Sequence, residues 1–350
     1  MPRVAVVGCG DVSIVHFEAI EAIADAELVA VCDSDPATLR AAAAQYRVPG
    51  FADHRQLVDA VAPDVVHVCT PHDQHADLAI DCIRAGVGVL VEKPLAHTSA
   101  EGERVVMAAA EYGAKIGVCY QNRYNATAQA VHSALESGRL GGVLGGFGTV
   151  MWRRPAAYYQ SRPWRGRWQS SGGGVMINQA IHTLDLLQWF LGEVTQFQGG
   201  VSQRLLGSDI EVEDTVDLVL DHSSGARSVL FATAANVVDS PVTLEIVTEE
   251  ATLYVRGDLT ITYADGRVET VYERVADSGG RAYWGVSHQL LIRDFYDRLA
   301  EDEPFWISPA EAAKSLRIIG ELYARSGFGV PRGSAESSTG RKRGIRLIPE

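Results

Sequence analysis

Val4–Ser13, VAVVGCGDVS, is an apolar run that ends in a glycine turn, and it governs how the first third of the chain is expected to fold. The apolar residues are typical of a buried strand, and Gly8 and Gly10 take the first two positions of the pattern G-x-G-x-x-G. Gly8 allows a tight turn, while Gly10 leaves room for a pyrophosphate beside the amides of the next helix. Ser13 replaces the third glycine with a side chain small enough for helix–strand packing. The stretch predicts a dinucleotide site, with a ligand-free glycine turn as the alternative.

The segments that follow this turn alternate between strand and helix patterns. Residues 1–121 are therefore expected to form an α/β domain with a doubly wound parallel sheet and helices on both faces. The pattern changes at residue 122, and residues 122–330 are expected to form an α+β domain with a mostly antiparallel sheet of five or six further strands. Residues 331–350 are expected to be a flexible tail. The expected elements of the second domain include helices at 126–137, after 174 to about 191, 287–300 and 309–326, and a strand at 146–153.

The composition of the 350-residue chain excludes several classes of protein. A formal net charge of −13 would repel a phosphate backbone, so we expect no nucleic-acid partner. No apolar run approaches the roughly 18 residues that a membrane span needs, and the N-terminus lacks the pattern of a signal peptide. The five cysteines show no zinc spacing, and their odd count argues against a disulfide framework. We interpret them as buried thiols in a reducing compartment and expect a cytoplasmic protein without membrane contact.

Asp33 stands at the end of the second expected strand, 23 residues after Gly10. A carboxylate there can accept hydrogen bonds from both ribose hydroxyls of NAD and would repel the additional phosphate of NADP. Asp35 adds to that repulsion, and Arg40 lies a turn or more into the next helix. The sequence therefore favours NAD over NADP. The alternative role of Asp33 is that of a helix cap before Pro36, for which Asp35 is better placed.

A later strand pattern, GVLVEKPLAHT (Gly88–Thr98), ends in an acid and a base. The carboxyl ends of strands in a doubly wound sheet face the ligand crevice, so Glu92 and Lys93 are expected beside the cofactor. Lys93 is the candidate group for handling the hydroxyl proton and the developing alkoxide charge of a hydride transfer, since a nearby cation can lower a lysine pKa. Pro94 would hold the turn rigid. A surface salt bridge of Glu92 is the alternative interpretation.

A polar stripe crosses the otherwise apolar segment Gly172–Gly192, GGGVMINQAIHTLDLLQWFLG. Asn178, His182 and Asp185 are four and three residues apart and would share one face of a helix. Polar groups on so apolar a helix must meet partners or a ligand. His182 is the candidate general base, Asn178 could hold a substrate hydroxyl, and Asp185 could orient the imidazole. A satisfied core histidine is the alternative.

Four stretches together resemble the Gfo/Idh/MocA oxidoreductases, the family of glucose–fructose oxidoreductase and inositol dehydrogenase. They are VAVVGCGDVS, CTPHDQHADLAIDCIRAGVGVLVEKPLA, WRGRW and GGGVMINQAIHTLDLLQWFLG, and the resemblance extends to about residue 330. It implies a Rossmann domain followed by a domain with an open-faced, mostly antiparallel sheet that often builds oligomers. It also implies NAD(P)-dependent oxidation or reduction of a sugar, sugar nucleotide or cyclitol hydroxyl. A homodimer or homotetramer is expected, since an open sheet face needs cover.

The resemblance implies roles for individual residues, and two more candidates come from position alone. By similarity, Trp164 and Arg165 contact cofactor or substrate, and Tyr283 does likewise. Arg123 and His288 are placed near the substrate by position, although His288 could instead cap the helix that follows. The expected cofactor-binding residues are Gly8, Gly10, Asp11, Val12, Asp33, Ser34, Thr70, Pro71, His75, Glu92, Lys93, Gln121, Trp164 and Arg165. The expected substrate-binding residues are Lys93, Arg123, Arg165, Asn178, His182 and His288, of which Lys93, His182 and Asn178 are the catalytic candidates.

The chain departs from the family at Asn178, where many members carry aspartate. Asparagine cannot take a proton, so proton transfer falls on His182 and Lys93, and the inositol dehydrogenase mechanism does not transfer directly. Some members that act on sugar nucleotides share the asparagine. His72 and His75 form an H-x-x-H pattern near Cys69, but no third ligand follows, so no metal is expected.

The segment Arg153–Trp168, RRPAAYYQSRPWRGRW, is basic and aromatic. Its five arginines favour a phosphate or carboxylate on the substrate, with RNA binding, a solvated loop or an arm swapped onto a neighbouring subunit as alternatives. The predicted function is therefore that of a cytoplasmic, NAD-dependent dehydrogenase of a sugar, sugar nucleotide or cyclitol. Two alternatives remain: a glycosidase that uses NAD without net redox change, and a non-catalytic regulator that binds NAD and a sugar.

Overall fold

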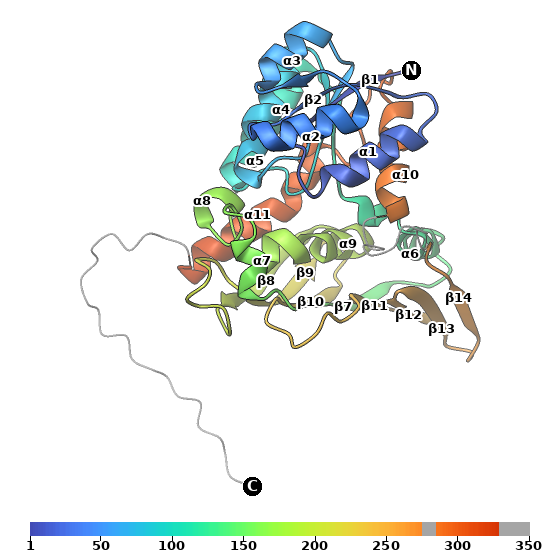
Figure 1. Ribbon diagram of the computed structural model, residues 1–350. Helices are drawn as coiled ribbons and strands as arrows, with labels where there is room; N and C mark the ends of the chain where they lie inside the picture. Colours follow the sequence, from blue (N-terminus) through green and yellow to red (C-terminus); the bar gives the residue numbers. More distant parts are fainter. Residues whose placement is uncertain (275–284, 329–350) are drawn as a thin grey trace.

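The computed structural model describes residues 1–274 and 285–328, which build two sheets with their helices (Figure 1). The expected tail, residues 331–350, and Tyr283 lie outside the described residues. One contiguous apolar core extends through both sheets. Within the described ranges, no helix combines the length and apolar character needed to cross a membrane.

The first sheet is parallel throughout, with the strand order β3-β2-β1-β4-β5-β6, as predicted for residues 1–121. Because the order reverses beside β1, the carboxyl ends of β1 and β4 border a crevice, which is where open α/β sheets bind ligands. The strands are β1 (Arg3–Val7), β2 (Glu27–Cys32), β3 (Gly50–Phe51), β4 (Val65–Val68), β5 (Gly88–Val91) and β6 (Ile116–Val118). The helices are α1 (Ser13–Ala22), α2 (Pro36–Tyr46), α3 (His54–Val61), α4 (His75–Arg84) and α5 (Ser99–Tyr112), with short 3-10 turns at His72–Gln74 and Gln121–Tyr124.

The second sheet is mostly antiparallel and has the order β14-β13-β12-β11-β7-β10-β9-β8, in which β7 and β10 run parallel. Its strands are β7 (Val143–Met151), β8 (Val194–Ser202), β9 (Thr215–His222), β10 (Arg227–Thr233), β11 (Thr243–Thr248), β12 (Ala251–Arg256), β13 (Asp258–Tyr263) and β14 (Val268–Val271). The helices of this half of the chain are α6 (Ala126–Glu136), α7 (Ala156–Gln160), α8 (Trp168–Ser171), α9 (Ile181–Leu191), α10 (Gly285–Asp297) and α11 (Pro309–Ser326). Helix α10 packs back against α1 of the Rossmann domain, and α11 packs against both α5 and β8.

The two faces of the second sheet differ in cover. Helix α9 lies between this sheet and the Rossmann domain in Figure 1, and none of the helices that the structure describes covers the opposite face. We call that opposite surface the open face; it is defined by five side chains that are 36–41% exposed. They are Phe147, Val219, Val229, Val247 and Tyr254, and the strand register places them on the same side of the sheet. The alternation of buried and exposed residues along β9 and β10 follows from this one-sided burial.

The structure differs from the sequence prediction in two elements of this domain. Seven strands, β8 to β14, follow α9 where five or six were predicted. The helix predicted after residue 174 divides into a π-helical turn, Met176–Ala180, and the regular helix α9. The closing helix α11 begins and ends where the sequence predicts, since Ser308 caps its first turn and Gly327 ends it in a left-handed conformation.

Candidate active site

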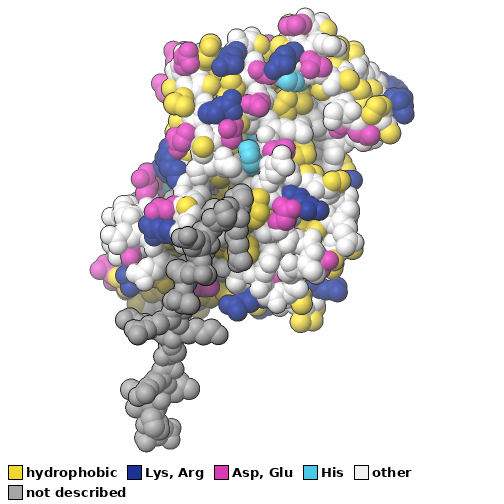
Figure 2. Space-filling model, turned by 90° about the vertical axis from the view of Figure 1, so that its left-hand side faces the viewer, with side chains coloured by type: hydrophobic (Ala, Val, Ile, Leu, Met, Phe, Trp, Pro, Cys, Tyr) yellow, Lys and Arg dark blue, Asp and Glu magenta, His cyan; other side chains and the backbone are white. Residues whose placement is uncertain are grey.

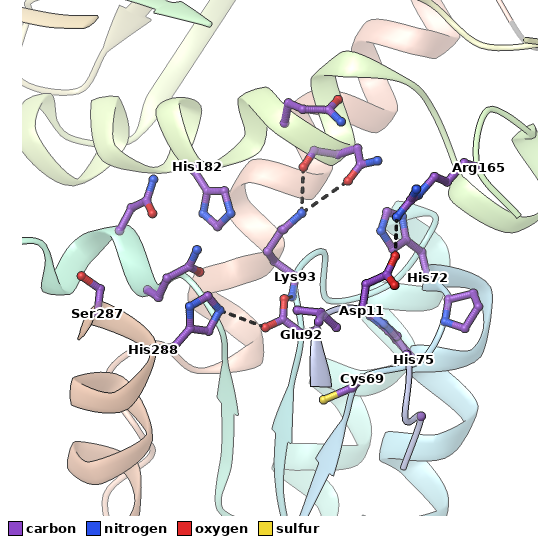
Figure 3. Close-up of a pocket in the computed structure, with 18 of the residues that line it drawn as sticks. Asp11, Cys69, His72, His75, Glu92, Lys93, Arg165, His182, Ser287 and His288 are labelled. Carbon is purple, nitrogen blue, oxygen red and sulfur yellow. Dashed lines mark hydrogen bonds and ion pairs between the residues drawn. The ribbon is translucent and has the colours of Figure 1, made fainter. Parts of the chain in front are cut away.

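A cavity of about 1300 Å³ opens between the two sheets. The carboxyl ends of β1, β2, β4 and β5 form one wall, and the π-helical turn with the start of α9 forms the other. Figure 3 shows Lys93 and His182 approaching each other across this cavity, with Glu92 and His288 on one side and Asp11 and Arg165 on the other. The cavity brings residues that are far apart in sequence into one site.

The glycine loop at the end of β1 fits the approach of an anion. Gly8 has φ +90°, and a Cβ there would lie 2.7 Å from the carbonyl carbon of Cys69, so a side chain is excluded. A Cβ at Gly10 would meet nothing within 4 Å, because that position faces the open cavity. Ser13 closes the loop with a 2.7 Å hydrogen bond from its hydroxyl to the Gly10 carbonyl. The first amides of α1 lack a side-chain cap and face the same space.

Asp33 lines the cavity at the end of β2 together with Ser34. Its carboxylate accepts hydrogen bonds from the amides of Cys9 and Asp35, both at 2.8 Å, which fixes its position beside the glycine loop. Asp35, and not Asp33, caps α2 through a 2.7 Å bond from the Thr38 amide. The helix-cap alternative for Asp33 is thereby excluded.

Lys93 extends from the end of β5 to the π-helical turn. Its ammonium donates to the main-chain carbonyl of Asn178 at 2.7 Å and approaches Asn178 Oδ1 at 3.5 Å. Such turns occur often at functional sites, since they redirect main-chain groups. Burial lowers the pKa of Lys93, an effect that Glu92 opposes and Arg165 reinforces. The lysine is therefore set up to gain or lose a proton nearer neutral pH than an exposed amine.

Glu213 holds in place the glycine-rich segment that precedes the π-helical turn. This fully buried carboxylate accepts from the amides of Gly174 (2.8 Å) and Met176 (2.9 Å) and from the Tyr323 hydroxyl (2.8 Å). A Cβ at Gly174 would lie 1.8 Å from the Glu213 carbonyl oxygen, so the chain passes here only as glycine. Burial raises the pKa of Glu213 to about 7. The glycines thus serve close packing that fixes the position of Asn178.

His182 is half-buried in the cavity wall, and its buried Nδ1 has no hydrogen-bond partner among the residues that the structure describes. Burial and the nearby Lys93 hold its pKa well below the ordinary 6.5, so the imidazole is neutral. A neutral imidazole that borders a cavity can accept a proton from a ligand.

The predicted role of Asp185 is wrong. Its carboxylate turns away from His182 and accepts two hydrogen bonds from Arg123, at 2.8 and 2.7 Å. Arg123 also pairs with Glu311 at 2.9 Å and does not line the cavity, so it is not placed to contact the substrate. Burial raises the pKa of Asp185 against the opposing effect of Arg123. These residues form a buried ion pair that ties the turn after β6 to α9 and α11.

Comparison with known proteins identifies the family. The description "Oxidoreductase family, NAD-binding Rossmann fold" matches residues 2–120, and that of the GFO/IDH/MocA C-terminal domain matches residues 128–254. The chain belongs to the Gfo/Idh/MocA oxidoreductases. The predicted fold and the predicted class, an NAD-binding oxidoreductase, are thereby confirmed.

Several family members are similar over much of the chain. The inositol 2-dehydrogenase of Rhizobium meliloti is 30% identical over 65% of this chain and 67% of its own length. A D-apiose dehydrogenase of Paraburkholderia graminis is also 30% identical over 65% of this chain, and the match spans 59% of that relative. The crystal structure of the WlbA dehydrogenase from Bordetella pertussis, in complex with NADH and UDP-GlcNAcA, has 31% identity and a TM-score of 0.80, covering 94% of this chain and 97% of that one.

In this Gfo/Idh/MocA oxidoreductase, five residues that line the cavity each have a buried polar atom without a partner. Thr70 Oγ1, Gln121 Oε1, Arg165 Nε, Gln179 Oε1 and His182 Nδ1 have no hydrogen-bond partner among the described residues. Buried polar atoms are rarely left without partners in a folded protein. With the open space at Gly10, they indicate that the cavity is shaped for a polar ligand the size of a dinucleotide and its substrate.

The remaining predicted cofactor residues line the same cavity, and most have partners within the protein. Val12 and Pro71 contribute apolar surface. His75 is held between the carbonyls of Pro94 (2.7 Å) and Thr70 (2.9 Å), which leaves no ring nitrogen for a metal. Trp164 lies against His72 with ring centroids 4.8 Å apart, and the Lys93–Pro94 peptide bond is cis.

Sequence reasoning missed several residues of the oxidoreductase's cavity. Asp11 was predicted only to touch the cofactor, yet it pairs with Arg162 (2.5 Å) and Arg165 (3.2 Å) and so joins the glycine loop to the second domain. Arg167 was grouped with the basic cluster, but it pairs with Glu211 and does not line the cavity. The missed lining residues include Asn122, Asn125, Trp152, Gln179 and Arg274. For Asn122, Asn125 and Gln179, the available signal in the sequence was a polar residue just after β6 or inside an apolar helix.

Proposed function

We propose that the protein transfers a hydride between NAD and a ring carbinol carbon of a sugar, sugar nucleotide or cyclitol. The observation that carries this proposal is the convergence of Lys93 and His182 in the cavity that also contains the glycine loop. Hydride transfer from a carbinol needs both a base for the hydroxyl proton and a stabilising group for the alkoxide charge. The dehydrogenase names of the similar proteins support the same substrate classes.

Each group in the cavity has a distinct role in the proposed reaction. NAD, bound along the glycine loop, supplies the hydride acceptor. His182 removes the hydroxyl proton, since its low pKa keeps it neutral. The Lys93 ammonium stabilises the negative charge that develops on the oxygen and exchanges a proton with it. Asn178 orients the substrate hydroxyl and positions Lys93 through its carbonyl.

The proposed cofactor is NAD in preference to NADP. Asp33 is fixed beside the glycine loop by two main-chain amides, and Asp35 follows it, so two acids border the adenosine ribose position. They would repel the 2′-phosphate of NADP. NADH in the similar WlbA structure supports this choice.

The arginines of the segment after β7 favour a substrate with a phosphate or carboxylate. Arg153, Arg154, Arg162 and Arg165 line the cavity, and Arg274 borders it from the β14 side. The guanidinium of Arg154 stacks over Trp152 and Tyr158, and that of Arg165 over Tyr158, which holds them in place with little loss of entropy on binding. Figure 2 shows acidic and basic side chains interspersed over one face of the molecule.

The test is the absorbance of NADH with purified protein, NAD or NADP, and a panel of free hexoses, inositols, uronic acids and UDP- or dTDP-sugars. We expect signal with one class and NAD, and at least tenfold weaker signal with NADP. Among the active class, members that carry a carboxylate or phosphate are expected to have the lower KM. Turnover of uncharged sugars alone would contradict the role given to the arginines, and equal use of NADP would contradict that of Asp33.

We further propose that the protein is a cytoplasmic homodimer or homotetramer assembled through the open face. All five cysteines are free thiols, which supports a reducing compartment. The open face leaves five neighbouring apolar side chains 36–41% exposed. Monomeric proteins rarely expose so many apolar neighbours together. Light scattering should give a multiple of the 37.8 kDa chain mass, and Phe147→Glu with Val229→Glu should shift it to the monomer. A wild-type monomer at micromolar concentration would contradict this assembly, and Met107→Glu, at an exposed residue of α5 in the Rossmann domain, is the control.

A further inference from the structure

A row of buried polar side chains runs through the Rossmann domain next to Lys93, and no step of the proposed reaction uses it. We define the buried chain as Tyr296, His67, His16 and Glu92, which α10, β4, α1 and the end of β5 contribute. His16 and His67 are 0% exposed and Glu92 is 5% exposed. A histidine in the middle of an apolar parallel strand, as His67 is, requires a partner for each ring nitrogen.

The buried chain is continuous by hydrogen-bond distance. The Tyr296 hydroxyl lies 2.8 Å from His67 Nε2. His67 Nδ1 lies 2.9 Å from His16 Nδ1, and His16 Nε2 lies 3.1 Å from Glu92 Oε1. His288 Nε2 reaches the same Glu92 oxygen at 3.3 Å, from α10. The other Glu92 oxygen accepts from the Lys93 amide at 3.2 Å.

Hydrogen bonding gives the buried chain one direction when Glu92 is ionised. A neutral imidazole has one donor and one acceptor nitrogen, and a carboxylate only accepts. His16 must then donate from Nε2, which leaves its Nδ1 as an acceptor. His67 must donate from Nδ1, which leaves its Nε2 to accept from the Tyr296 hydroxyl. All four groups are satisfied in this arrangement without a charged imidazole.

The opposite direction has a different consequence at Glu92. If His67 donates to Tyr296, then His16 donates from Nδ1 and presents a bare Nε2 to the carboxyl. Glu92 must then carry a proton, or a metal ion must stand in place of that proton. A metal ion is the alternative because ligand atoms of His16, Glu92 and His288 lie within 4.8 Å of one another. The pKa directions agree with the first arrangement. Burial lowers the pKa of His16 and His67, and the bonds from His16 and His288 hold the pKa of Glu92 well below its ordinary value although burial alone would raise it.

Lys93 is the charged group that an ionised Glu92 affects most directly. Burial lowers the pKa of Lys93, Glu92 is the largest opposing effect, and Arg165 acts with burial. His288 contacts Glu92 directly, with its Nε2 3.3 Å from Glu92 Oε1. Five further titratable groups interact with Glu92, and burial favours their uncharged forms because it raises the pKa of the thiols and lowers that of the imidazoles. They are Cys69 at the end of β4, Cys119 at the end of β6, His72 and His75 of the segment after β4, and His182 of α9.

We propose that the buried chain holds Glu92 as an anion beside Lys93, so that the amine keeps its proton in a cavity that otherwise favours the neutral form. Tyr296, His67 and His16 are then positioning residues that act on the reaction through Glu92. Only the effect of this arrangement on catalysis depends on the proposed function, in which Lys93 takes part in the reaction. The direction of the buried chain and the charge of Lys93 can both be measured without turnover.

The first test reads the direction of the buried chain. Nitrogen-15 NMR of protein labelled at its ten histidines, assigned with single-site variants, reports which ring nitrogen carries the proton. At pH 7 we expect a neutral His16 protonated at Nε2 and a neutral His67 protonated at Nδ1. The reversed tautomers would overturn the proposal, as would one equivalent of a divalent metal in elemental analysis of the purified protein.

The second test reads the charge of Lys93 in the unliganded protein. The chain has four lysines, so a carbon-13 lysine titration resolves each of them, with Lys93→Met for assignment. His16→Leu removes one donor to Glu92 and is expected to lower the pKa of Lys93 by about one unit. His16→Gln keeps an N–H donor and should retain most of the wild-type value.

His222→Leu is the matched control for this titration. His222 is also buried and bonded at both nitrogens, to Gly192 and Ser228, but it lies in β9 outside the cavity. This variant should leave the Lys93 titration unchanged even though it loses stability. An unchanged Lys93 pKa in folded His16→Leu would overturn the proposal, whether or not the protein proves to be a sugar dehydrogenase.

Discussion

Replacement of Lys93 by methionine is expected to lower kcat for carbinol oxidation about 10³-fold, which corresponds to roughly 4 kcal/mol of transition-state stabilisation. Methionine fills a similar volume but provides neither a charge for the alkoxide nor a proton. The ammonium also donates to the Asn178 carbonyl at 2.7 Å, so some loss of stability accompanies the change. Cofactor binding should survive, because the glycine loop and Asp33 are untouched.

Two further variants separate the roles of Lys93. Lys93→Arg keeps the positive charge but cannot lose a proton, so it should recover part of the rate if charge stabilisation dominates and none if proton transfer dominates. Lys115→Met is the control, since Lys115 is half-buried and bonds to the Glu303 carbonyl away from the cavity. A Lys93→Met protein that is folded, binds NAD and turns over within tenfold of the wild type would contradict the proposed mechanism.

Replacement of His182 by asparagine is expected to lower kcat by about 10²- to 10³-fold with little change in KM, since it removes the general base and keeps a polar side chain of related shape. The wild-type rate should stay constant down to pH 6.5 and fall only below it. The sign follows from the lowered pKa, because the neutral, proton-accepting form of His182 persists to a more acidic pH than that of a free imidazole.

The pH–rate profile of kcat/KM measures this effect directly. His182→Asn should lose the acid limb that His182 causes, whereas His222→Asn, another buried histidine outside the cavity, should keep it. A His182→Asn protein with raised KM and unchanged kcat would show that this histidine only binds substrate.

The parallel arrangement of the first sheet was predictable because its sequence signals are local. The segment β4 is fully buried and β5 nearly so. In the sequence β5 is a continuous apolar run and β4 an apolar run interrupted by His67, which is close to the pattern of strands that are covered on both faces. Helix α11 was predictable for a related reason, since Ser308, Pro309 and Gly327 mark its start and end. In each case the residues that determine the element lie within it or next to it.

The catalytic candidates could be predicted singly, but their contacts could not. Lys93 and Asn178 are 85 residues apart, and only the tertiary fold shows that the ammonium bonds to the Asn178 main chain. The π-helical turn changes the helical period at Asn178, which a 3.6-residue pattern does not predict. Asp185 has the spacing of a partner for His182, yet a stronger ion-pair partner, Arg123, reaches it from the turn after β6.

The buried chain was missed because each of its members looked ordinary alone. His67 interrupts the apolar run VVHV, and that interruption was the one available signal, since a polar residue in a strand buried on both faces must find partners. The partners, His16 and Tyr296, lie 51 residues before and 229 residues after it in sequence. Such networks become visible only when the helices are packed.

The most direct test of the central claim follows the hydride itself. A substrate found in the panel, deuterated at its carbinol carbon, is incubated with protein and NAD, and product and cofactor are quantified by mass spectrometry. The proposed function predicts one deuterated NADH for each oxidised product, with the rate lost in Lys93→Met and His182→Asn. Release of an aglycone without net NADH, or binding of NAD and sugar without any transfer of deuterium, would contradict it and favour the redox-neutral glycosidase or the regulator.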